Sequence, residues 1–271
     1  MHRRLALLAI LFSAPALAGP MSPEVLEALP RADVVLMGEV HDNPTHHANQ
    51  TRVAAALQPR AIVFEMLTPD QAARVTAENR DDAAALAEAL GWEGSGWPGF
   101  ALYHPIFTAA PGAAIFGGAL PREMVRRAFE ADAAEVFGAD AGRYGLDRAL
   151  PQVEQAAREA EQMAAHCDAL PEAMLPGMVA AQRLRDAALA RAVVQAADAR
   201  LLPVLVITGN GHARRDRGVP VYLAAAAPQL SLLSLGQFEA APAKPPPFDL
   251  WLLTDPAERE EPCLAFRTGG G

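Results

Sequence analysis

Two apolar segments of the sequence end in the same short pattern, a glycine followed three residues later by a histidine. The first segment, V-V-L-M-G-E-V-H, ends at His41, and the second, V-L-V-I-T-G-N-G-H, ends at His212. A third apolar segment, A-I-V-F-E-M, carries Glu65 near its end. If these segments are parallel strands, their carboxyl ends meet at one edge of the sheet, where ligand sites of such sheets form. We therefore expect His41, Glu65 and His212 to converge, with Glu39 close by.

Two histidines and one carboxylate are a ligand set that suits zinc or ferrous iron and leaves coordination positions open. His41, Glu65 and His212 are therefore candidate metal ligands. If the protein is an enzyme, this set favours a metal-dependent hydrolase, with Glu39 and Glu65 as the catalytic carboxylates. The alternative is that each side chain is an ordinary hydrogen-bonded residue at the start of a loop. The sequence has no H-E-x-x-H pattern, so a zincin-type protease is not predicted.

Polar residues on two predicted helices are candidates to hydrogen-bond those side chains and so fix their orientation. His47 lies on the first turns of the helix that follows His41, and Gln182, Arg185 and Asp186 interrupt the apolar stripe of a later, long helix. Gln182 and Asp186 are four residues apart and share a helix face. Such residues can hydrogen-bond a metal-ligating histidine. The alternative is a solvated helix start and an ordinary surface salt-bridge face.

Short β-branched or apolar runs alternate with longer helical stretches, which predicts an α/β fold with a mostly parallel central sheet and crossover helices. The predicted strands are Asp33–Gly38, Ala61–Glu65, Ala113–Gly117, Pro203–Thr208 and Leu230–Leu235. From about residue 122 to 199 the sequence is almost entirely helical, with long helices predicted over Pro151–His166 and Pro171–Ala197. This block indicates a helical insertion between the third and fourth strands.

The C-terminal segment, residues 240–271, is predicted to contain a Pro-rich linker and edge strands. The linker runs from Pro242 to Pro247, and two short β-like runs follow it, Phe248–Leu253 and Cys263–Phe266. We expect these runs to add antiparallel strands to one edge of the sheet. Residues 19–271 are accordingly predicted to form a single domain.

The first eighteen residues have the pattern of a cleavable signal peptide. A basic pair at positions 3 and 4 precedes an apolar run, Leu5–Phe12, and A-L-A at 16–18 is a small-x-small cleavage site. We expect cleavage after Ala18 and a soluble, periplasmic protein that begins at Gly19. No cysteine lies near this site, so no lipid anchor is predicted. No later run has the roughly 18 apolar residues that a membrane span needs.

Cys167 and Cys263 are the only two cysteines of the chain. In an oxidising compartment, two cysteines of an exported protein can form one disulfide. The alternative is two unpaired thiols, with Cys167 acting as a small buried hydrophobic residue. Pairing geometry cannot be read from a sequence, so both interpretations stay open.

The composition is that of an ordinary globular protein and disfavours nucleic acid as a partner. The 271 residues include 32 Asp and Glu against 23 Lys and Arg, which leaves a net charge of −9 at pH 7. An acidic chain without a basic tract lacks the counterion release that drives nucleic-acid binding. We therefore expect no nucleic-acid partner.

Six stretches of the sequence, taken together, are distinctive. They are G-E-V-H-D-N-P-T-H-H-A-N-Q at 38–50, V-F-E-M at 63–66, W-P-G-F-A-L-Y-H-P-I-F at 97–107, A-H-C-D-A-L-P at 165–171, A-Q-R-L-R-D at 181–186 and I-T-G-N-G-H-A-R at 207–214. This combination resembles the ChaN-like haem-binding proteins, a branch of the Tiki/TraB and erythromycin-esterase-like superfamily. The resemblance spans roughly Ala32 to Leu235.

The resemblance implies an exported protein of a bacterial iron or haem uptake pathway. It implies that haem is held between two protomers, as a haem-dependent homodimer, with an outer-membrane haem receptor as a candidate partner. The histidine pair and the glutamate shared by the superfamily fall on His41, His212 and Glu65. Members of the family are often lipoproteins, and this chain departs from them because it lacks the lipidated cysteine.

Haem requires an iron ligand, an apolar slot and cations for its two propionates, and Tyr and His can both serve as ligands. Tyr103 and His104 lie in the densest aromatic stretch of the sequence. We expect Tyr103 to be the ligand, with Tyr144 second. Arg143, beside Tyr144, is placed to meet a propionate, and His166 is a further haem-binding candidate. The alternative for the aromatic stretch is an ordinary core cluster.

Overall fold

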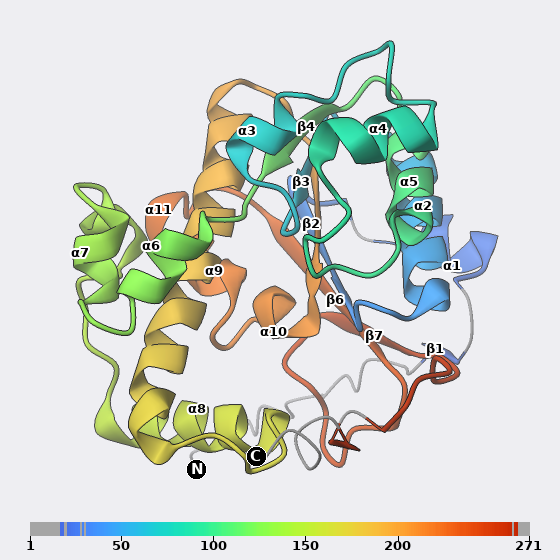
Figure 1. Ribbon diagram of the computed structural model, residues 1–271. Coiled ribbons are helices and arrows are strands. Elements are labelled where there is room, and N and C mark those ends of the chain that lie inside the picture. The colour runs from blue at the N-terminus through green and yellow to red at the C-terminus, as the bar shows by residue number, and fades with distance from the viewer. Residues whose placement is uncertain (1–16, 19–20, 28, 30, 262, 265–271) are drawn as a thin grey trace, which may run out of the picture.

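One seven-stranded sheet organises the computed structural model, which describes residues 17–18, 21–27, 29, 31–261 and 263–264. Every strand pair among these residues is parallel, and the order across the sheet is β1-β7-β6-β2-β5-β3-β4 (Figure 1). The strands are β1 (Leu17–Ala18), β2 (Val34–Glu39), β3 (Ala61–Phe64), β4 (Ala114–Gly117), β5 (Val204–Gly209), β6 (Leu232–Phe238) and β7 (Leu250–Leu253). The predicted α/β fold is confirmed, and the five predicted strands correspond to β2 to β6.

The two middle strands, β2 and β5, are covered on both faces. All of their residues are buried, which explains their nearly uninterrupted apolar sequences. Successive side chains point to opposite faces of a strand. Accordingly, Val34 and Leu36 pack into the core on one face of the sheet, and Val35 and Met37 pack into the core on the other. Polar side chains of these strands can therefore reach a cleft only at the strand ends.

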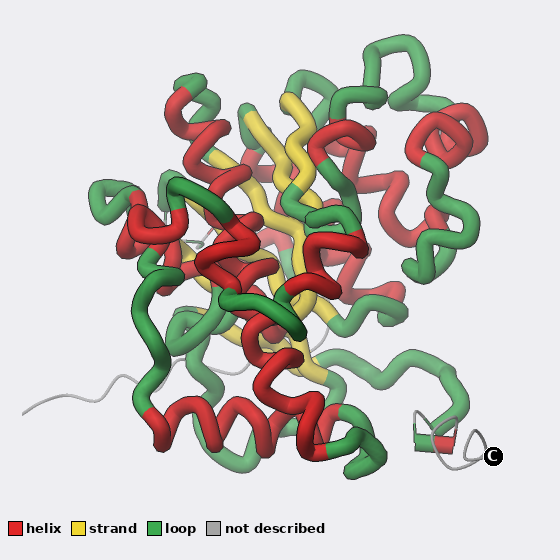
Figure 2. The backbone as a smooth tube through the Cα atoms, turned by 60° about the vertical axis from the view of Figure 1, so that its left-hand side comes forward, coloured by secondary structure: helices red, strands yellow, loops and turns green. Residues whose placement is uncertain are grey.

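Helices cover both faces of the sheet. On one face lie α9 (Leu175–Asp198) and α11 (Val219–Ala226), and on the other lie α2 (Pro44–Leu57) and α5 (Phe100–Ala109) (Figures 1 and 2). The remaining helical elements are α1 (Pro23–Glu27), α3 (Pro69–Ala72), α4 (Ala83–Leu90), α6 (Arg122–Arg127), α7 (Ala133–Phe137), η1 (Ala141–Tyr144), α8 (Gln152–Ala165), η2 (Glu172–Met174) and α10 (Asn210–Ala213). Within the described ranges, no helix is long and apolar enough to cross a membrane.

The helical insertion predicted between the third and fourth strands is confirmed between β4 and β5. It contains α6 to α9, and the two predicted long helices correspond to α8 and α9. α9 lies against the sheet and buries an apolar stripe that includes Leu184 and Val193. α8 packs on α9 away from the sheet, and Arg158 is the one side chain that it buries among its described residues (Figure 1).

The predicted direction of the C-terminal edge strand is wrong, because β7 runs parallel to β6, with Leu250 paired to Leu235. The Pro-rich segment between them, residues 239–249, carries the chain back along the edge of the sheet. Its length approaches the dozen residues that a parallel crossover needs. Of the second predicted run, Cys263 and Leu264 are not in a strand, and residues 265–266 lie outside the described residues.

Cys167 and Cys263 form a disulfide, with their Cα atoms 5.6 Å apart. The bond joins the C-terminal tail to the segment that follows α8. Earlier in the tail, Arg259 pairs with Asp42 at 2.7 Å and with Glu239 at 2.6 Å. The tail is therefore fastened both to the helical insertion and to the loop that follows β2.

Candidate functional site

The carboxyl ends of three neighbouring strands, β2, β5 and β3, bring His41, His212 and Glu65 into one cleft. The cleft has a volume of about 1680 Å³. Its polar lining includes Glu39, His41, Glu65, Gln182, Arg185 and His212. Gly209, at the end of β5, permits the close approach, because a Cβ atom at this position would lie 2.8 Å from His41 Nε2. The structure thus places the three residues together at the sheet edge.

Glu65 is held by the end of the neighbouring strand. Its Oε2 accepts hydrogen bonds from Thr208 Oγ1 at 2.6 Å and from the Gly209 amide at 2.7 Å. Its Oε1 faces His212 Nε2 at 3.4 Å. Burial alone would raise the pKa of Glu65, but the charges and hydrogen bonds around it, those of His212 first, lower the pKa far below its usual range. Glu65 is therefore a carboxylate at every physiological pH.

His212 lies between two carboxylates. Its Nδ1 donates to Asp186 Oδ1 at 2.6 Å, and its Nε2 faces Glu65. Burial alone would lower the pKa of His212, but the charges of Glu65 and Asp186 outweigh it and raise the pKa. The amide of Gln182 lies 3.1 Å from Nδ1, so two of the three polar residues expected on the long helix, Gln182 and Asp186, contact this histidine, and the third, Arg185, lines the cleft. His212 is therefore an imidazolium with both ring nitrogens engaged.

His41 pairs with Glu39 at the floor of the cleft. Nδ1 of His41 lies 2.8 Å from Glu39 Oε1, and 36% of the histidine side chain is exposed. Burial lowers the pKa of His41, but the hydrogen bond to Glu39 and the charge of Glu65 outweigh it and raise the pKa. Trp97 packs edge-on against the ring, with centroids 5.0 Å apart. Nε2 of His41 has no hydrogen-bond partner among the described residues, so it is the ring nitrogen available to a ligand.

Glu39 is the buried anchor of this arrangement, with 2% of the residue exposed. Besides His41, it accepts hydrogen bonds from the Tyr103 hydroxyl at 2.9 Å and from Gln50 Nε2 at 2.6 Å. His47 faces it with Nδ1 at 3.5 Å, and its Nε2 donates to the His41 carbonyl at 2.7 Å. Three elements, β2, α2 and α5, therefore fix the orientation of His41 through one carboxylate.

His46 holds the first Gly-x-x-His turn from the opposite side. α2 begins at Pro44, and the Asn43 side chain caps it, which places His46 in its first turn. The Val40 amide donates to His46 Nδ1 at 2.9 Å, and Nε2 bonds to Thr254 Oγ1 at 2.8 Å. Because an amide only donates, Nδ1 must be unprotonated. Burial accordingly lowers the pKa of His46 to about 4.

This neutral histidine predicts a loss of stability in mild acid. In the unfolded chain the imidazole of His46 is protonated with a pKa of about 6.5, whereas in the folded chain its pKa is about 4. The contribution of His46 is present above pH 6.5 and is lost as the pH falls through this window. Between pH 7 and pH 4.5, we expect the free energy of unfolding of His46→Gln to fall by about 2 kcal/mol less than that of the wild type. Urea unfolding at both pH values measures this, and equal losses in the two proteins would contradict it.

The donor atoms in the cleft do not support the predicted divalent metal. A metal requires free lone pairs, but both nitrogens of His212 face carboxylates and Oε2 of Glu65 already accepts two hydrogen bonds. In the part of the chain that the structure describes, no group of three or more His, Cys, Asp or Glu side chains could hold a metal ion. In this structure His41, Glu65 and His212 take part in a network of histidine–carboxylate pairs.

The structure places Tyr103 behind the cleft and not in it. Its side chain is fully buried in the core on the α5 face, and its hydroxyl donates to Glu39. Burial and the nearby Glu39 raise the pKa of Tyr103 well above its usual range, so the hydroxyl keeps its proton. This position does not support Tyr103 as the haem ligand. His104 points elsewhere, with Nε2 bonded to the Arg80 carbonyl at 2.9 Å.

The other predicted haem contacts are dispersed. Tyr144 is buried in the core on the α9 face, opposite Tyr103, and packs edge-on against Phe137. Arg143 lies over the Tyr144 ring at 5.9 Å and is exposed. His166 ends α8 and is half-buried, with Nδ1 near the Gln162 carbonyl. Because the sheet separates the two tyrosines, one haem cannot contact both within a single chain.

Three further residues contribute to the site. Trp97, from the aromatic stretch around Tyr103, and Phe129 form apolar parts of the cleft wall, and Gln50 binds Glu39. Gln50 is three residues after His47 and therefore shares its helix face, and this spacing marks it in the sequence. Phe129 follows α6 in a segment with no motif, so no signal of this kind marked it.

Comparison with known proteins gives one family match. The family model for haem-binding uptake, Tiki superfamily, ChaN, matches residues 25–223, which is most of the chain. No curated protein matches. A solved structure of cofacial heme binding to ChaN of Campylobacter jejuni is similar, with a TM-score of 0.63 and 19% identity, covering 84% of this chain and 88% of that one. At this identity the likeness shows a shared fold.

Two further solved structures are similar over much of their length. The type III effector HopBA1 has a TM-score of 0.47 and 14% identity, covering 83% of this chain and 88% of that one. A mutant of the erythromycin esterase EreC in its open conformation has a TM-score of 0.42 and 12% identity, covering 80% of this chain and 75% of that one.

Proposed function

The chain belongs to the haem-binding uptake family ChaN of the Tiki superfamily, and from that premise we propose that it binds haem in the cleft beside His41. The family match across residues 25–223 is the observation that carries the proposal. Haem, when bound, supplies an iron whose axial positions accept donors from the protein. Binding it requires an apolar wall, a ligand and a cation.

Apolar side chains in the lining of the cleft suit a flat ligand. They are Trp97, Leu120, Val125, Phe129 and Leu189. Phe129 is 40% exposed, so its ring is accessible to a ligand in the cleft. The volume of about 1680 Å³ exceeds the range of roughly 300–1,000 Å³ for drug-sized ligands. The cleft therefore has room and apolar surface for a porphyrin.

His41 is the side chain best placed to ligate the iron. Tyr103 and Tyr144 are buried outside the cleft, and the ring nitrogens of His212 are both engaged. His41 keeps Nδ1 on the Glu39 carboxylate and leaves Nε2 without a partner among the described residues. A carboxylate behind a ligating histidine fixes the ring and increases its basicity. We therefore assign the ligand to His41, in place of the tyrosines predicted from the sequence.

Arg185 is the cation best placed for a propionate. It lines the cleft one turn from Gln182, is exposed and forms no ion pair with any described residue. We expect Arg185→Gln to weaken hemin binding about tenfold, since a charged hydrogen bond contributes about 1.5–3 kcal/mol. Fluorescence-quenching titration with hemin measures the affinity. The matched control is Arg60→Gln, which should bind hemin as the wild type does. Arg60 is exposed and directly precedes β3, at the amino ends of the strands and away from the cleft. Equal weakening in both variants would contradict the assignment.

We further propose that haem binding is coupled to dimerisation. A flat ligand has two apolar faces, and one cleft wall covers only one of them well. A second protomer closing over the bound haem buries the other face, so ligand and partner stabilise each other. Sedimentation velocity with and without hemin tests this, and the expected result is a monomer that becomes a dimer. An unchanged sedimentation coefficient at saturating hemin would contradict it.

Export to the periplasm, in an iron or haem uptake pathway with an outer-membrane receptor as partner, is proposed from the N-terminal sequence and the family. Most of the signal-like segment lies outside the described residues, and Leu17–Ala18 form β1 against β7. Cleavage after Ala18 would remove this two-residue pairing. Mass spectrometry of the native protein should find Gly19 as the first residue, and an uncleaved or acylated N-terminus would contradict export by this route.

A second candidate function, hydrolysis, is favoured by the two histidine–carboxylate pairs, His41 with Glu39 and His212 with Asp186. Such pairs can move protons during ester cleavage without a metal. Absorbance spectra of one purified sample with hemin, and assays of chromogenic esters, separate the two functions. A saturable Soret shift without ester turnover supports haem binding. Turnover that His41→Ala abolishes, with no Soret shift, supports the hydrolase.

A further inference from the structure

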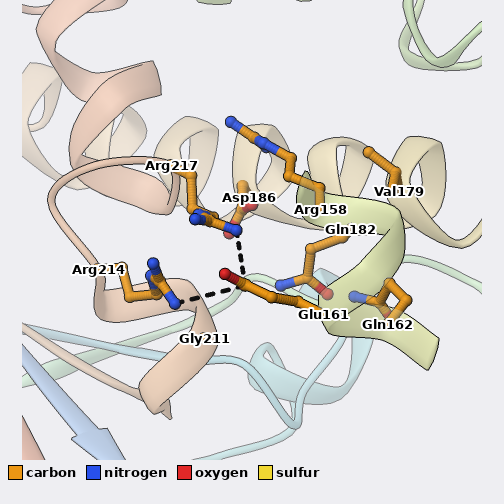
Figure 3. Close-up of a pocket in the computed structure, with 9 residues that line it drawn as sticks. All are labelled: Arg158, Glu161, Gln162, Val179, Gln182, Asp186, Gly211, Arg214 and Arg217. Atoms are coloured by element: carbon orange, nitrogen blue, oxygen red, sulfur yellow. Dashed lines mark hydrogen bonds and ion pairs between the residues drawn. The ribbon is translucent and has the colours of Figure 1, made fainter. Parts of the chain in front are cut away.

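A second, smaller pocket lies beside the cleft, on the far side of Gln182. It has a volume of about 180 Å³ and is formed by α8, α9 and the segment after β5 (Figure 3). Its lining residues are Arg158, Glu161, Gln162, Val179, Gln182, Asp186, Gly211, Arg214 and Arg217. We refer to it as the arginine pocket. Its volume is below the range for drug-sized ligands, so it suits a small anion or a single acidic group of a larger ligand.

Two arginines of this pocket converge on one carboxylate oxygen of the chain itself. Nη1 of Arg217 lies 2.6 Å from Glu161 Oε2, and Nη1 of Arg214 lies 3.5 Å from the same atom (Figure 3). The Glu161 side chain is 52% exposed, so it can turn out into solvent. An exposed ion pair of this kind contributes at most about 1 kcal/mol. Glu161 is therefore held weakly, and its carboxylate shows that the two arginines bind an acidic oxygen.

The other carboxylates near the pocket already have partners, and one of them, Asp216, pairs with Arg214 and faces Nε of Arg217 at 3.5 Å. Asp186 is bonded to His212 at 2.6 Å. Asp216 accepts hydrogen bonds from Nε and Nη2 of Arg214, at 2.9 and 2.7 Å. The remaining nitrogen of Arg214, Nη1, is directed at Glu161. Arg158 also lines the pocket, is nine-tenths buried and is paired with Glu154 at 2.5 Å. Once Glu161 leaves, two arginine donors face the pocket without an acceptor.

The arginine pocket adjoins the cleft through two shared residues. Gln182 and Gly211 line both cavities, and the cleft continues on their other side to Arg185 and His212. A ligand bound in the cleft could therefore extend an acidic group past the Gln182 amide into the pocket. A free anion could equally enter from solvent, past the exposed Glu161.

We propose that the arginine pocket is an oxyanion site, which takes a carboxylate or phosphate group on Arg217 and Arg214 in exchange for the Glu161 carboxylate. The oxyanion belongs either to a haem propionate or to a free anion of the medium. The site itself does not depend on haem, and only the first of these two sources rests on the proposed function.

The test is a titration of the ¹⁵N-labelled full chain with inorganic phosphate, followed at the Gly211 amide. We expect a saturable shift, weakened at least about tenfold in Arg217→Gln, since a charged hydrogen bond is lost. We expect Glu161→Gln to bind phosphate about threefold more tightly, because the competing carboxylate is removed. Arg215→Gln is the matched control, since this neighbouring arginine pairs with Asp249 outside the pocket, and it should bind as wild type does.

Two results would overturn the site: no saturable shift of Gly211 in wild type, or equal phosphate affinity in wild type, Arg217→Gln and Glu161→Gln. Hemin and its dimethyl ester then identify the source of the anion. If hemin displaces phosphate and the ester does not, the oxyanion is a propionate. If neither displaces phosphate, the pocket binds a free anion. If hemin does not bind at all while phosphate does, the proposed function fails and the oxyanion site stands.

Discussion

Replacing Glu39 with alanine should lower the free energy of unfolding by about 3–5 kcal/mol. The carboxylate is almost completely buried and accepts hydrogen bonds from His41, Tyr103 and Gln50. Without it, these donors lose their short hydrogen bonds, and Tyr103 and Gln50 keep only backbone carbonyls at 3.5 Å. Each unsatisfied buried group costs about 1–3 kcal/mol. Urea unfolding followed by tryptophan fluorescence measures the loss.

The matched control is Tyr103→Phe, which removes one of these donors and leaves the carboxylate with the other two. It should cost only about 1 kcal/mol, the net contribution of one hydrogen bond. The comparison separates the network from general damage to the core, because both side chains are buried at the same place. If Glu39→Ala were no less stable than Tyr103→Phe, Glu39 would not be the anchor of the site.

Replacing His41 with alanine should weaken hemin binding about a hundredfold or more and remove the Soret band that the bound complex shows. The reason is that His41 lines the cleft, imidazole is a common iron ligand, and Nε2 of His41 has no hydrogen-bond partner among the described residues. In typical metal sites, removing only a residue that hydrogen-bonds a ligating side chain already lowers metal affinity or activity 10- to 100-fold. Absorbance titration with hemin measures both effects.

Tyr103→Phe and Tyr144→Phe are the controls for this prediction, because these tyrosines are the ligands that the sequence alone favoured. Both variants should keep the wild-type Soret band, since neither hydroxyl reaches the cleft. A normal band in His41→Ala together with a lost band in either tyrosine variant would place the iron elsewhere.

The central strands could be predicted from the sequence because they are buried on both faces. Such strands have few polar positions, so β2 and β5 stand out as apolar runs. The direction of β7 could not be predicted in the same way. A short edge strand has the same composition in either direction, and its direction depends on the path of residues 239–249 through space. The pairing of Cys167 with Cys263 likewise depends on where the tail lies.

The convergence of His41, Glu65 and His212 could be predicted because parallel strands end at one edge. Their chemistry could not, since it depends on which atoms are already bonded: Asp186 and Glu65 engage both nitrogens of His212, which no sequence pattern reveals. The burial of Tyr103 did leave a signal. It lies three residues after Phe100 and four before Phe107, on one apolar face of α5, and this spacing indicates the core.

The position of the iron tests the proposed function most directly. Diffraction data collected at the iron absorption edge from crystals of the hemin complex would locate it without reference to the porphyrin density. We predict an anomalous peak within bonding distance of His41 Nε2, inside the cleft that Trp97 and Phe129 border. A peak beside Tyr103, Tyr144 or His166, or on a surface outside the cleft, would contradict the account.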